Sequence, residues 1–208
     1  MVIRNLMHQD ISGVVRIHCK NLPDSPFVQM GAEFLSEVYY PTLLKDKNTF
    51  CLGYEWERNL AGFICGTTNA SALSRKLVML NLFIFPMIAV KILLRDPKRI
   101  GAFLGLVRFI LEKPPREAKR IRAQLLSFAI DEEFRSAEFF KQHQIKIANE
   151  LFHAAVMELK QRGVIEFKVI TDRKNIANIF YRNMGMGMAA PNDPQNEYCL
   201  YIGNTGAL

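Results

Sequence analysis

Cysteine is scarce in this sequence, and its positions suit neither a zinc site nor a disulfide framework. The chain of 208 residues has four cysteines, Cys19, Cys51, Cys65 and Cys199, and none of them forms a Cys-x-x-Cys pair. Its four histidines form no His-Glu-x-x-His motif. Structural zinc domains and disulfide-rich secreted domains depend on such closely spaced residues. We therefore expect a reduced, metal-free and intracellular protein.

The sequence predicts neither an export signal nor a membrane-spanning segment. Residues 1–5 carry a charge at Arg4 and have no apolar core of signal-peptide length, so a cytoplasmic location is expected. Residues 77–94 are nearly all apolar, but Asn81, Pro86 and Lys91 interrupt them. A transmembrane helix needs about 20 consecutive apolar residues, so we do not predict that this segment crosses a bilayer.

The positive charge of the chain is concentrated in one segment. The net charge is +7, yet residues 70–122 hold twelve lysines and arginines against three acidic residues, a net of +9. The remainder of the chain holds fifteen basic and seventeen acidic residues, a net of −2. The excess positive charge therefore lies in residues 70–122, and a partner that it attracts would bind this segment.

Residues 124–185 read as strand, loop, long helix, strand and short helix. Residues 124–130 form a mostly apolar run that ends at three acidic residues, and residues 165–171 alternate at period two, so both are predicted strands. Apolar residues recur between them at helical spacing: Ile145, Ile147, Leu151, Phe152, Ala155, Val156 and Leu159. Such a unit has parallel strands, and it places the helix N-terminus beside the end of the first strand, where free N–H groups attract phosphate.

The rest of the chain predicts further short elements. Residues 34–39 indicate a helix that Pro41 closes, and residues 49–55 and 60–67 indicate a hairpin. Two closing strands are expected within residues 186–190 and 196–202. Residues 204–208 are expected to fray.

Residues 175–185 resemble the Asn-x-x-Ala-x-x-Phe-Tyr-x-x-x-Gly pattern of the GNAT superfamily of N-acyltransferases, and residues 125–131 resemble the fourth strand of that family. The resemblance implies an α/β (α+β) fold with a mixed, largely antiparallel, twisted sheet, one parallel strand pair and flanking helices. It also implies an enzyme that moves an acyl group, with acetyl as the first expectation, from acyl-coenzyme A to a primary amine. No metal is implied.

The resemblance assigns roles to several residues. Tyr181 stands where many members place the proton donor for the departing thiolate, although it is alternatively a packed aromatic residue. The backbone of Phe128, Ala129 and Ile130 would pair with the pantetheine arm of the donor. Asn175 would face the cofactor or a bound water, or would cap the following helix.

The pyrophosphate loop of the family reads Arg/Gln-x-x-Gly-x-Gly/Ala and aligns with residues 143–148, where only Ala148 fits. His143, Gln144, Lys146 and Ala148 are therefore the candidate phosphate-binding residues, and residues 136–142 look like an insertion. Lys146 replaces a glycine and could either bind the pyrophosphate or block it. The general base is not assigned, because Glu33 and Glu37 are read as solvated surface residues.

In the GNAT family the third strand is followed almost directly by the fourth, and residues 70–122 interrupt this order of elements. We therefore predict one domain, 1–208, with a basic helical insertion at residues 70–122. The insertion could pack as additional core on the acceptor side, or bind an anionic membrane surface or a lipid-linked substrate. An amino sugar on a nucleotide or lipid carrier is the acceptor that this charge suggests. The alternative is a catalytically silent GNAT fold that binds a membrane or a protein. Nucleic acid is disfavoured, because no reader motif is present.

Overall fold

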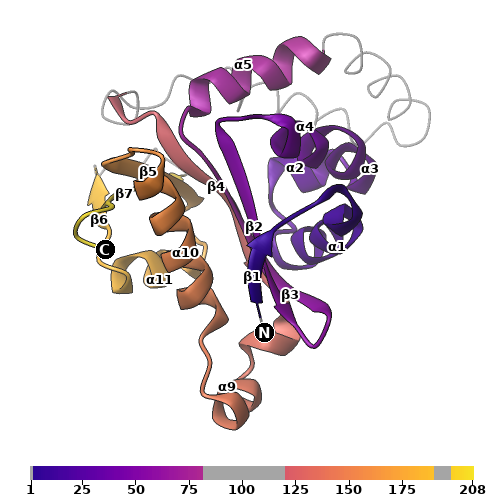
Figure 1. Cartoon of the computed structure of the whole chain (residues 1–208), viewed down its shortest axis with the longest axis vertical. Coiled ribbons are helices and arrows are strands. Elements are labelled where there is room, and N and C mark those ends of the chain that lie inside the picture. Colours follow the sequence, from indigo (N-terminus) through magenta and orange to yellow (C-terminus); the bar gives the residue numbers. More distant parts are fainter. Residues whose placement is uncertain (1, 82–119, 190–197) are drawn as a thin grey trace.

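The computed structural model describes residues 2–81, 120–189 and 198–208 (Figure 1). Seven strands of these residues form one sheet, in the order β1-β2-β3-β4-β5-β7-β6. The strands are β1 Val2–Asn5, β2 Thr49–Trp56, β3 Asn59–Thr67, β4 Ala123–Ile130, β5 Glu166–Asp172, β6 Gly187–Ala189 and β7 Tyr198–Asn204. Neighbouring strands are antiparallel except for β4 and β5, which are parallel. The mixed sheet with one parallel pair confirms the predicted fold class.

Helices cover both faces of the sheet (Figure 1). They are α1 Ile11–Asn21, α2 Pro26–Gln29, α3 Ala32–Phe34, α4 Tyr40–Lys45, α5 Ala70–Asn81, α9 Ala137–His143, α10 Ile147–Gln161 and α11 Ala177–Asn183. Short 3₁₀ helices lie at His8–Asp10 (η1) and Glu132–Arg135 (η4), and a π-helix, η2, lies at Leu35–Tyr39. The predicted long helix and the strands on either side of it are therefore present as α10, β4 and β5.

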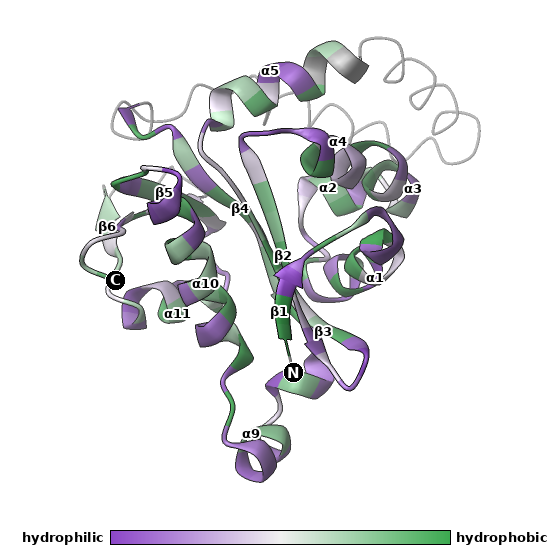
Figure 2. Cartoon of the chain, in the orientation of Figure 1, coloured by the Kyte–Doolittle hydropathy of each residue, from purple (hydrophilic) through white to green (hydrophobic). Residues whose placement is uncertain are grey.

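The alternation of side chains along the central strands divides the core into two clusters. Cys51 on β2 and Phe63 on β3 face the helices α1 to α4, with Val14 and Tyr39 in the same cluster. Residues of opposite parity, such as Ile64, join α10 and α11 on the other face. Figure 2 shows apolar residues along the central strands and a hydrophilic turn between β2 and β3. Two-sided burial explains why these strands read as nearly continuous apolar runs.

The helix that follows Gly31 does not end at Pro41, and this prediction was wrong. The chain continues through η2 into α4, with Pro41 in its first turn. The π-turn is the physical reason: Tyr40 N–H donates to Leu35 O, five residues back, so the wider turn absorbs the proline that a regular helix would exclude. The same turn lets the adjacent residues Tyr39 and Tyr40 both be buried.

The C-terminal residues are held against the sheet, so the predicted fraying was also wrong. Thr205 is only 6% exposed; its backbone N–H donates to Ile165 O at 2.9 Å and its hydroxyl donates to Val164 O at 2.7 Å. Leu208 packs against the α10 side of the core. These contacts tie the tail to the connection between α10 and β5, which a local sequence pattern does not reveal.

No helix in residues 2–81, 120–189 and 198–208 is long and apolar enough to span a membrane. The predicted membrane-facing apolar runs fall almost entirely on residues 82–119, which lie outside the described residues.

Candidate active site

The parallel strands β4 and β5 stop pairing part-way along their length. Ala123 to Leu125 pair with Phe167 to Val169, and the register ends there. Beyond this point β4 stays with β3 as far as Ile130, whereas β5 continues beside β7 as far as Asp172. Within residues 2–81, 120–189 and 198–208, no strand therefore pairs with residues 126–130 of β4 on the side that faced β5, and we call that side the open edge.

A β-bulge lies where the two strands separate. Cys65 pairs with Ser127 and Gly66 with Leu125, so Leu126 is an extra residue on β4. A bulge bends its strand and increases its twist, which turns the end of β4 away from β5. The open edge is thus a consequence of one additional residue in β4.

The direction of the backbone groups on the open edge follows from one hydrogen bond. Asp131 N–H donates to Ala61 O at 2.8 Å, so these two residues are a hydrogen-bonded pair of β3 and β4. Such pairs alternate along an antiparallel ladder, so Ala129 also points its N–H and C=O toward β3. Phe128 and Ile130 consequently point theirs toward the open edge. Of the three predicted pantetheine-pairing residues, these two have the required direction.

Tyr181 lies in α11, the helix that packs against β4 at the open edge through the neighbouring residue Phe180. The ring of its neighbour Phe180 lies 5.5 Å from that of Phe128 on β4, which brings α11 against this strand. Tyr181 itself is 6% exposed and packs against Phe152 and Tyr201. Burial raises the pKa of its hydroxyl above the ordinary value of 10, so the group is protonated at neutral pH. Among the described residues, its hydroxyl has no hydrogen-bond partner.

Asn175 lies just before α11 and serves it locally. Its side-chain oxygen accepts a hydrogen bond from Ala177 N–H at 2.9 Å, as in an Asx turn. Counted back from Tyr181, the asparagine of the GNAT pattern falls on Lys174, one residue earlier. The N-cap residue of α11 is Ile176, which has no side-chain cap hydrogen bond, so Asn175 orders the turn before the helix without being its N-cap. Cofactor contact by Asn175 stays a prediction.

The predicted insertion between β4 and α10 contains a helix, α9, which packs on the tip of the β2–β3 hairpin. The ring of His143 lies 4.7 Å from that of Trp56 and 4.7 Å from that of Phe139. Gln144 follows in a left-handed conformation, with φ of 58°, and ends α9. His143 is thus held in an aromatic cluster, while the exposed Gln144 turns the chain toward α10.

Lys146 is the N-cap residue of α10, and its φ of −108° is accessible to any amino acid, so the backbone here does not require the family's glycine. No side chain caps this helix end. The N–H groups of Ile147 and Ala148 precede the first intrahelical bond, which leaves them for an anion at the positive end of a 15-residue helix. The Lys146 ammonium lies 5.4 Å from the centre of the Phe140 ring, a cation–π contact that holds it toward α9.

Comparison with known proteins was made for both the sequence and the structure. No family model matches the chain, and no curated protein matches it. Solved structures do match along nearly the whole length. A protein from Desulfovibrio desulfuricans, assigned as an acetyltransferase of the GNAT family, superimposes with a TM-score of 0.57 at 12% identity, over 98% of both chains. The chain has the GNAT fold.

Two other structures with this fold are comparably similar. The PaiA N-acetyltransferase from Thermoplasma acidophilum, solved in complex with coenzyme A, gives a TM-score of 0.58 at 13% identity, over 98% of both chains. An aminoglycoside 6′-acetyltransferase of type Ii gives 0.54 at 12% identity, over 99% of this chain and 97% of that one. The fold is shared although few residues are, so each site residue has to be argued from its own surroundings.

A buried polar cluster beside the open edge escaped the sequence analysis. The hydroxyls of Tyr39 and Ser127 lie 3.1 Å apart, and His18 Nδ1 lies 2.5 Å from the Tyr40 hydroxyl. All four residues are less than 9% exposed. Burial lowers the pKa of His18 to about 4, so its ring is neutral at pH 7. The two consecutive tyrosines before Pro41 were the one feature of the sequence that could have indicated this cluster. A regular helix would not point both inward, so their burial is evident only from the π-turn.

The acidic residues considered for the general base are either exposed or held in an ion pair. Glu33 and Glu37 are both exposed, as expected of surface residues. Asp131 is 5% exposed and lies 2.5 Å from Arg16 and 3.4 Å from Lys20, both on α1. Its burial tends to raise the pKa of the carboxyl, but the Arg16 guanidinium outweighs this and the pKa is lowered. The geometry gives Asp131 the role of tying α1 to the end of β4.

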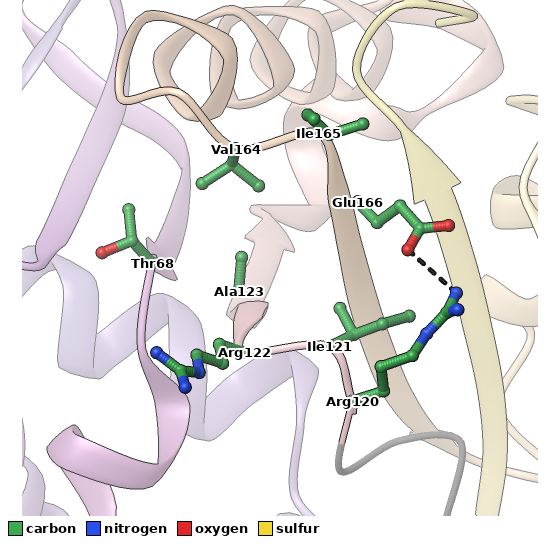
Figure 3. A pocket seen from close by; sticks show the side chains of 8 residues that line it. All are labelled: Thr68, Arg120, Ile121, Arg122, Ala123, Val164, Ile165 and Glu166. Atoms are coloured by element: carbon green, nitrogen blue, oxygen red, sulfur yellow. Dashed lines mark hydrogen bonds and ion pairs between the residues drawn. The ribbon is translucent and has the colours of Figure 1, made fainter.

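At the opposite end of β4 and β5 the described residues form a hollow of about 350 Å³. Figure 3 shows its lining, including the ion pair of Arg120 and Glu166 at 3.1 Å. The lining residues are Thr68, Arg120, Ile121, Arg122, Ala123, Val164, Ile165 and Glu166. This hollow lies where the strands still pair, so it is separate from the open edge. Within the described ranges, no three His, Cys, Asp or Glu side chains gather as a metal site would require.

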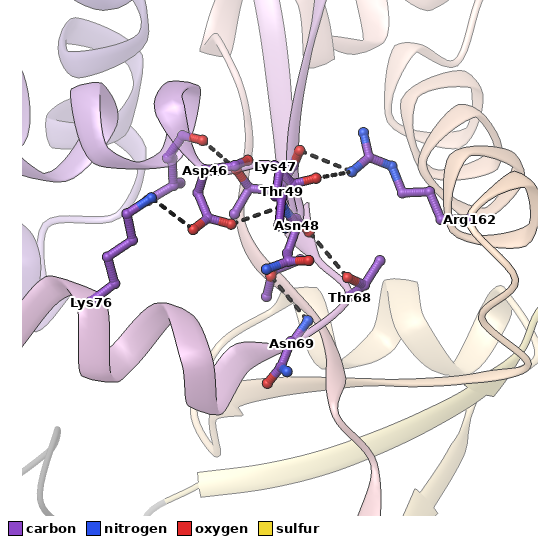
Figure 4. A network of polar contacts seen from close by, with 10 residues as sticks. Asp46, Lys47, Asn48, Thr49, Thr68, Asn69, Lys76 and Arg162 are labelled. Atoms are coloured by element: carbon purple, nitrogen blue, oxygen red, sulfur yellow. Dashed lines mark hydrogen bonds and ion pairs between the residues drawn. The ribbon is translucent and has the colours of Figure 1, made fainter.

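The residues that leave and re-enter the sheet around 70–122 meet at this end. Ala70 N–H donates to Arg122 O at 2.8 Å, so the two ends of the segment are adjacent. Helix α5 is attached to the connection between α4 and β2 by the ion pair of Lys76 with Asp46, at 3.0 Å (Figure 4). Arg162 at the end of α10 donates to the carbonyls of Lys47 and Thr49, each at 3.1 Å. This network joins α5, the α4–β2 connection and α10.

Proposed function

We propose that this protein transfers an acyl group, with acetyl as the first candidate, from acyl-coenzyme A to a primary amine of a small acceptor. One observation carries the proposal. The end of β4 has a backbone edge that no other described strand pairs with, on which Phe128 and Ile130 direct their N–H and C=O groups outward, and the adjacent helix α11 carries a buried, protonated tyrosine.

An unpaired strand edge recognises an extended ligand that carries amides, because it offers donors and acceptors at regular spacing. The pantetheine arm of coenzyme A is such a ligand. Its amides would pair with Phe128 and Ile130 as a neighbouring strand would, which directs the thioester toward the bulged part of β4. Any side chain permits these contacts, so this part of the site does not need the family's glycine-rich loop.

The chemistry requires a bond to form and a proton to move. The neutral amine nitrogen attacks the thioester carbonyl carbon, the carbon–nitrogen bond forms, and the carbon–sulfur bond breaks. The departing thiolate takes the proton of the Tyr181 hydroxyl, and the proton that the amine releases to water returns to the Tyr181 oxygen, which restores the donor. A donor held next to the sulfur contributes about 100-fold or more to the rate.

The N-terminus of α10 would hold the pyrophosphate through the N–H groups of Ile147 and Ala148. His143 and Gln144 border the same turn, so they stay candidates for phosphate contact. Lys146 has its ammonium near Phe140, within reach of a phosphate only if the side chain swings away from α9. These contacts would fix the outer end of the donor, while β4 fixes its reactive end.

Lys146 provides a direct test of the phosphate site. We expect Lys146→Ala to weaken coenzyme A binding severalfold if the ammonium contacts the pyrophosphate. Lys146→Gly should recover part of the loss, because it exposes the backbone. Isothermal titration would measure the three dissociation constants, with Lys160→Ala at the far end of α10 as the control. Equal affinity in all variants would place the phosphates elsewhere.

The acceptor is proposed to be an amino sugar on a nucleotide or lipid carrier, with residues 70–122 acting as an insertion in a single domain, 1–208. The charge of +9 in this segment supports a phosphate-bearing acceptor. Activity assays would compare free amino sugars with the same sugars on a uridine diphosphate carrier. A preference for the free sugar would argue against this acceptor.

A thermal shift with coenzyme A tests the proposed function most simply. A ligand present at about 100 times its dissociation constant adds about 2.7 kcal/mol to the free energy of unfolding. For a chain of this size that corresponds to a rise in Tm of roughly 5–10 °C. The absence of any shift at millimolar coenzyme A would contradict the proposal and favour a catalytically silent fold.

Binding of residues 70–122 to an anionic membrane surface stays a prediction. Each lysine or arginine near such a surface contributes about 1 kcal/mol, so binding should require anionic lipid and weaken with salt. Co-sedimentation with anionic and neutral vesicles at low and high salt would measure it, alongside a variant with Arg75, Lys76, Arg95, Lys98 and Arg99 neutralised. Binding that ignores lipid charge, salt and these substitutions would exclude an electrostatic membrane site.

A further inference from the structure

Two cysteines stand directly opposite each other in the centre of the sheet. Cys51 on β2 pairs with Cys65 on β3, and both are free thiols. Cys51 is 5% exposed and Cys65 is fully buried, in the same cluster as Tyr39 and Tyr40. They lie fourteen positions apart in the chain, so no local motif marks them.

Backbone hydrogen bonds on both sides of the pair determine its type. Thr68 N–H donates to Asn48 O at 2.8 Å, which makes residues 48 and 68 a hydrogen-bonded pair. Alternation along the ladder then makes Cys51 and Cys65, three positions further on, a non-hydrogen-bonded pair. A second hydrogen bond supports the same assignment. Leu6 N–H, just after β1, donates to Cys51 O at 2.8 Å, so the Cys51 carbonyl points toward β1 and away from β3.

Non-hydrogen-bonded pairs bring opposite residues closest together, with Cα atoms about 4.5 Å apart and side chains on one face. A disulfide requires Cα atoms about 4.4–6.8 Å apart and Cβ atoms about 3.5–4.5 Å apart. The pair therefore meets the requirement without a change of register. We infer that Cys51 and Cys65 form a redox-active dithiol site that closes to a cross-strand disulfide and stabilises the folded chain.

The site is closed to reagents in the packed protein. Burial raises the pKa of the Cys65 thiol, and its contact with Cys51 raises the pKa further, so the nucleophilic thiolate is scarce. Oxidation therefore requires a transient opening of the helices that cover this face, and a small two-electron thiol oxidant. With an azo oxidant such as diamide, one sulfur adds to nitrogen, and the second sulfur displaces that nitrogen. The sulfur–sulfur bond forms, and the oxidant leaves as a hydrazine carrying both protons.

The experiment uses the full chain with Cys19→Ser and Cys199→Ser, which removes the two less buried thiols. The protein is treated with diamide in native buffer and at urea concentrations below the unfolding midpoint. We expect an intact mass lower by two hydrogens, a peptide linking positions 51 and 65, and reversal by dithiothreitol. Closing a loop of this length should raise Tm by roughly 6–12 °C.

The control is the same protein with Cys51→Ala, in which diamide should produce neither the link nor the rise in Tm. Absence of the 51–65 link both in native buffer and in urea would overturn the inference, as would a link that leaves Tm unchanged or lowers it. Neither readout depends on catalysis, so the result is independent of the proposed acyl transfer.

Discussion

Tyr181→Phe is expected to lower kcat by about 100-fold or more while leaving the affinity for acyl-coenzyme A nearly unchanged. The reason is that the substitution removes the hydroxyl group, and with it the proton to be donated, but keeps the aromatic ring and its contacts. Tyr181 packs through its ring against Phe152 and Tyr201, and its hydroxyl has no hydrogen-bond partner among the described residues. Steady-state rates with the preferred amine, together with titration of coenzyme A, would separate turnover from binding.

Tyr201→Phe is the matched control, because it removes a hydroxyl from the same aromatic cluster on the neighbouring strand β7. It should retain kcat within a few fold. The raised pKa of Tyr181 adds a second expectation: the donor stays protonated in alkaline solution, so kcat should not fall as pH rises through 10. An unchanged kcat in Tyr181→Phe would remove this residue from the mechanism.

The second large effect concerns acid stability and His18. Burial lowers the pKa of this histidine from its ordinary value of 6.5 to about 4. Above pH 6.5, His18 is neutral in both the folded and the unfolded chain, so its ionisation does not reduce the free energy of unfolding. As pH falls below 6.5 the unfolded chain takes up a proton that the folded chain does not, so stability is lost progressively until about pH 4. The integrated loss is roughly 3 kcal/mol, at 1.36 kcal/mol for each pKa unit.

Urea unfolding at a series of pH values between 7 and 4 would measure this loss. His18→Asn places an uncharged amide where Nδ1 meets the Tyr40 hydroxyl, so it should be less stable at pH 7 but much less sensitive to acid. His153→Gln, at an exposed position of α10, should keep the sensitivity of the original protein. The carboxyls with lowered pKa, such as Asp131, lose their contribution only below about pH 4, outside this window. Equal slopes in all three proteins would show that His18 is not the group responsible.

Periodicity in the sequence was sufficient to predict the strands, the crossover helix and the parallel pair. The apolar run of residues 124–130 predicts a strand, and the helical spacing of apolar residues from Ile147 to Leu159 predicts a helix. Both patterns involve residues that are close together in the sequence. Residues 175–185 pointed to the GNAT fold for the same reason, because the motif around Tyr181 is also local in the sequence. Boundaries moved by one to three residues, since helix ends depend on caps and packing.

Tertiary structure alone decided where the site opens. The open edge depends on one bulged residue, Leu126, whose effect exists only relative to the register with β3. The meeting of Ser127 with Tyr39 joins residues 88 positions apart, and the burial of both Tyr39 and Tyr40 depends on a π-turn that Pro41 would have argued against. The anchoring of Thr205 likewise rests on carbonyls some 40 residues away. Local patterns arise from contacts between near neighbours, whereas these features arise from contacts between distant segments, which form only when the whole sheet and its helices pack together.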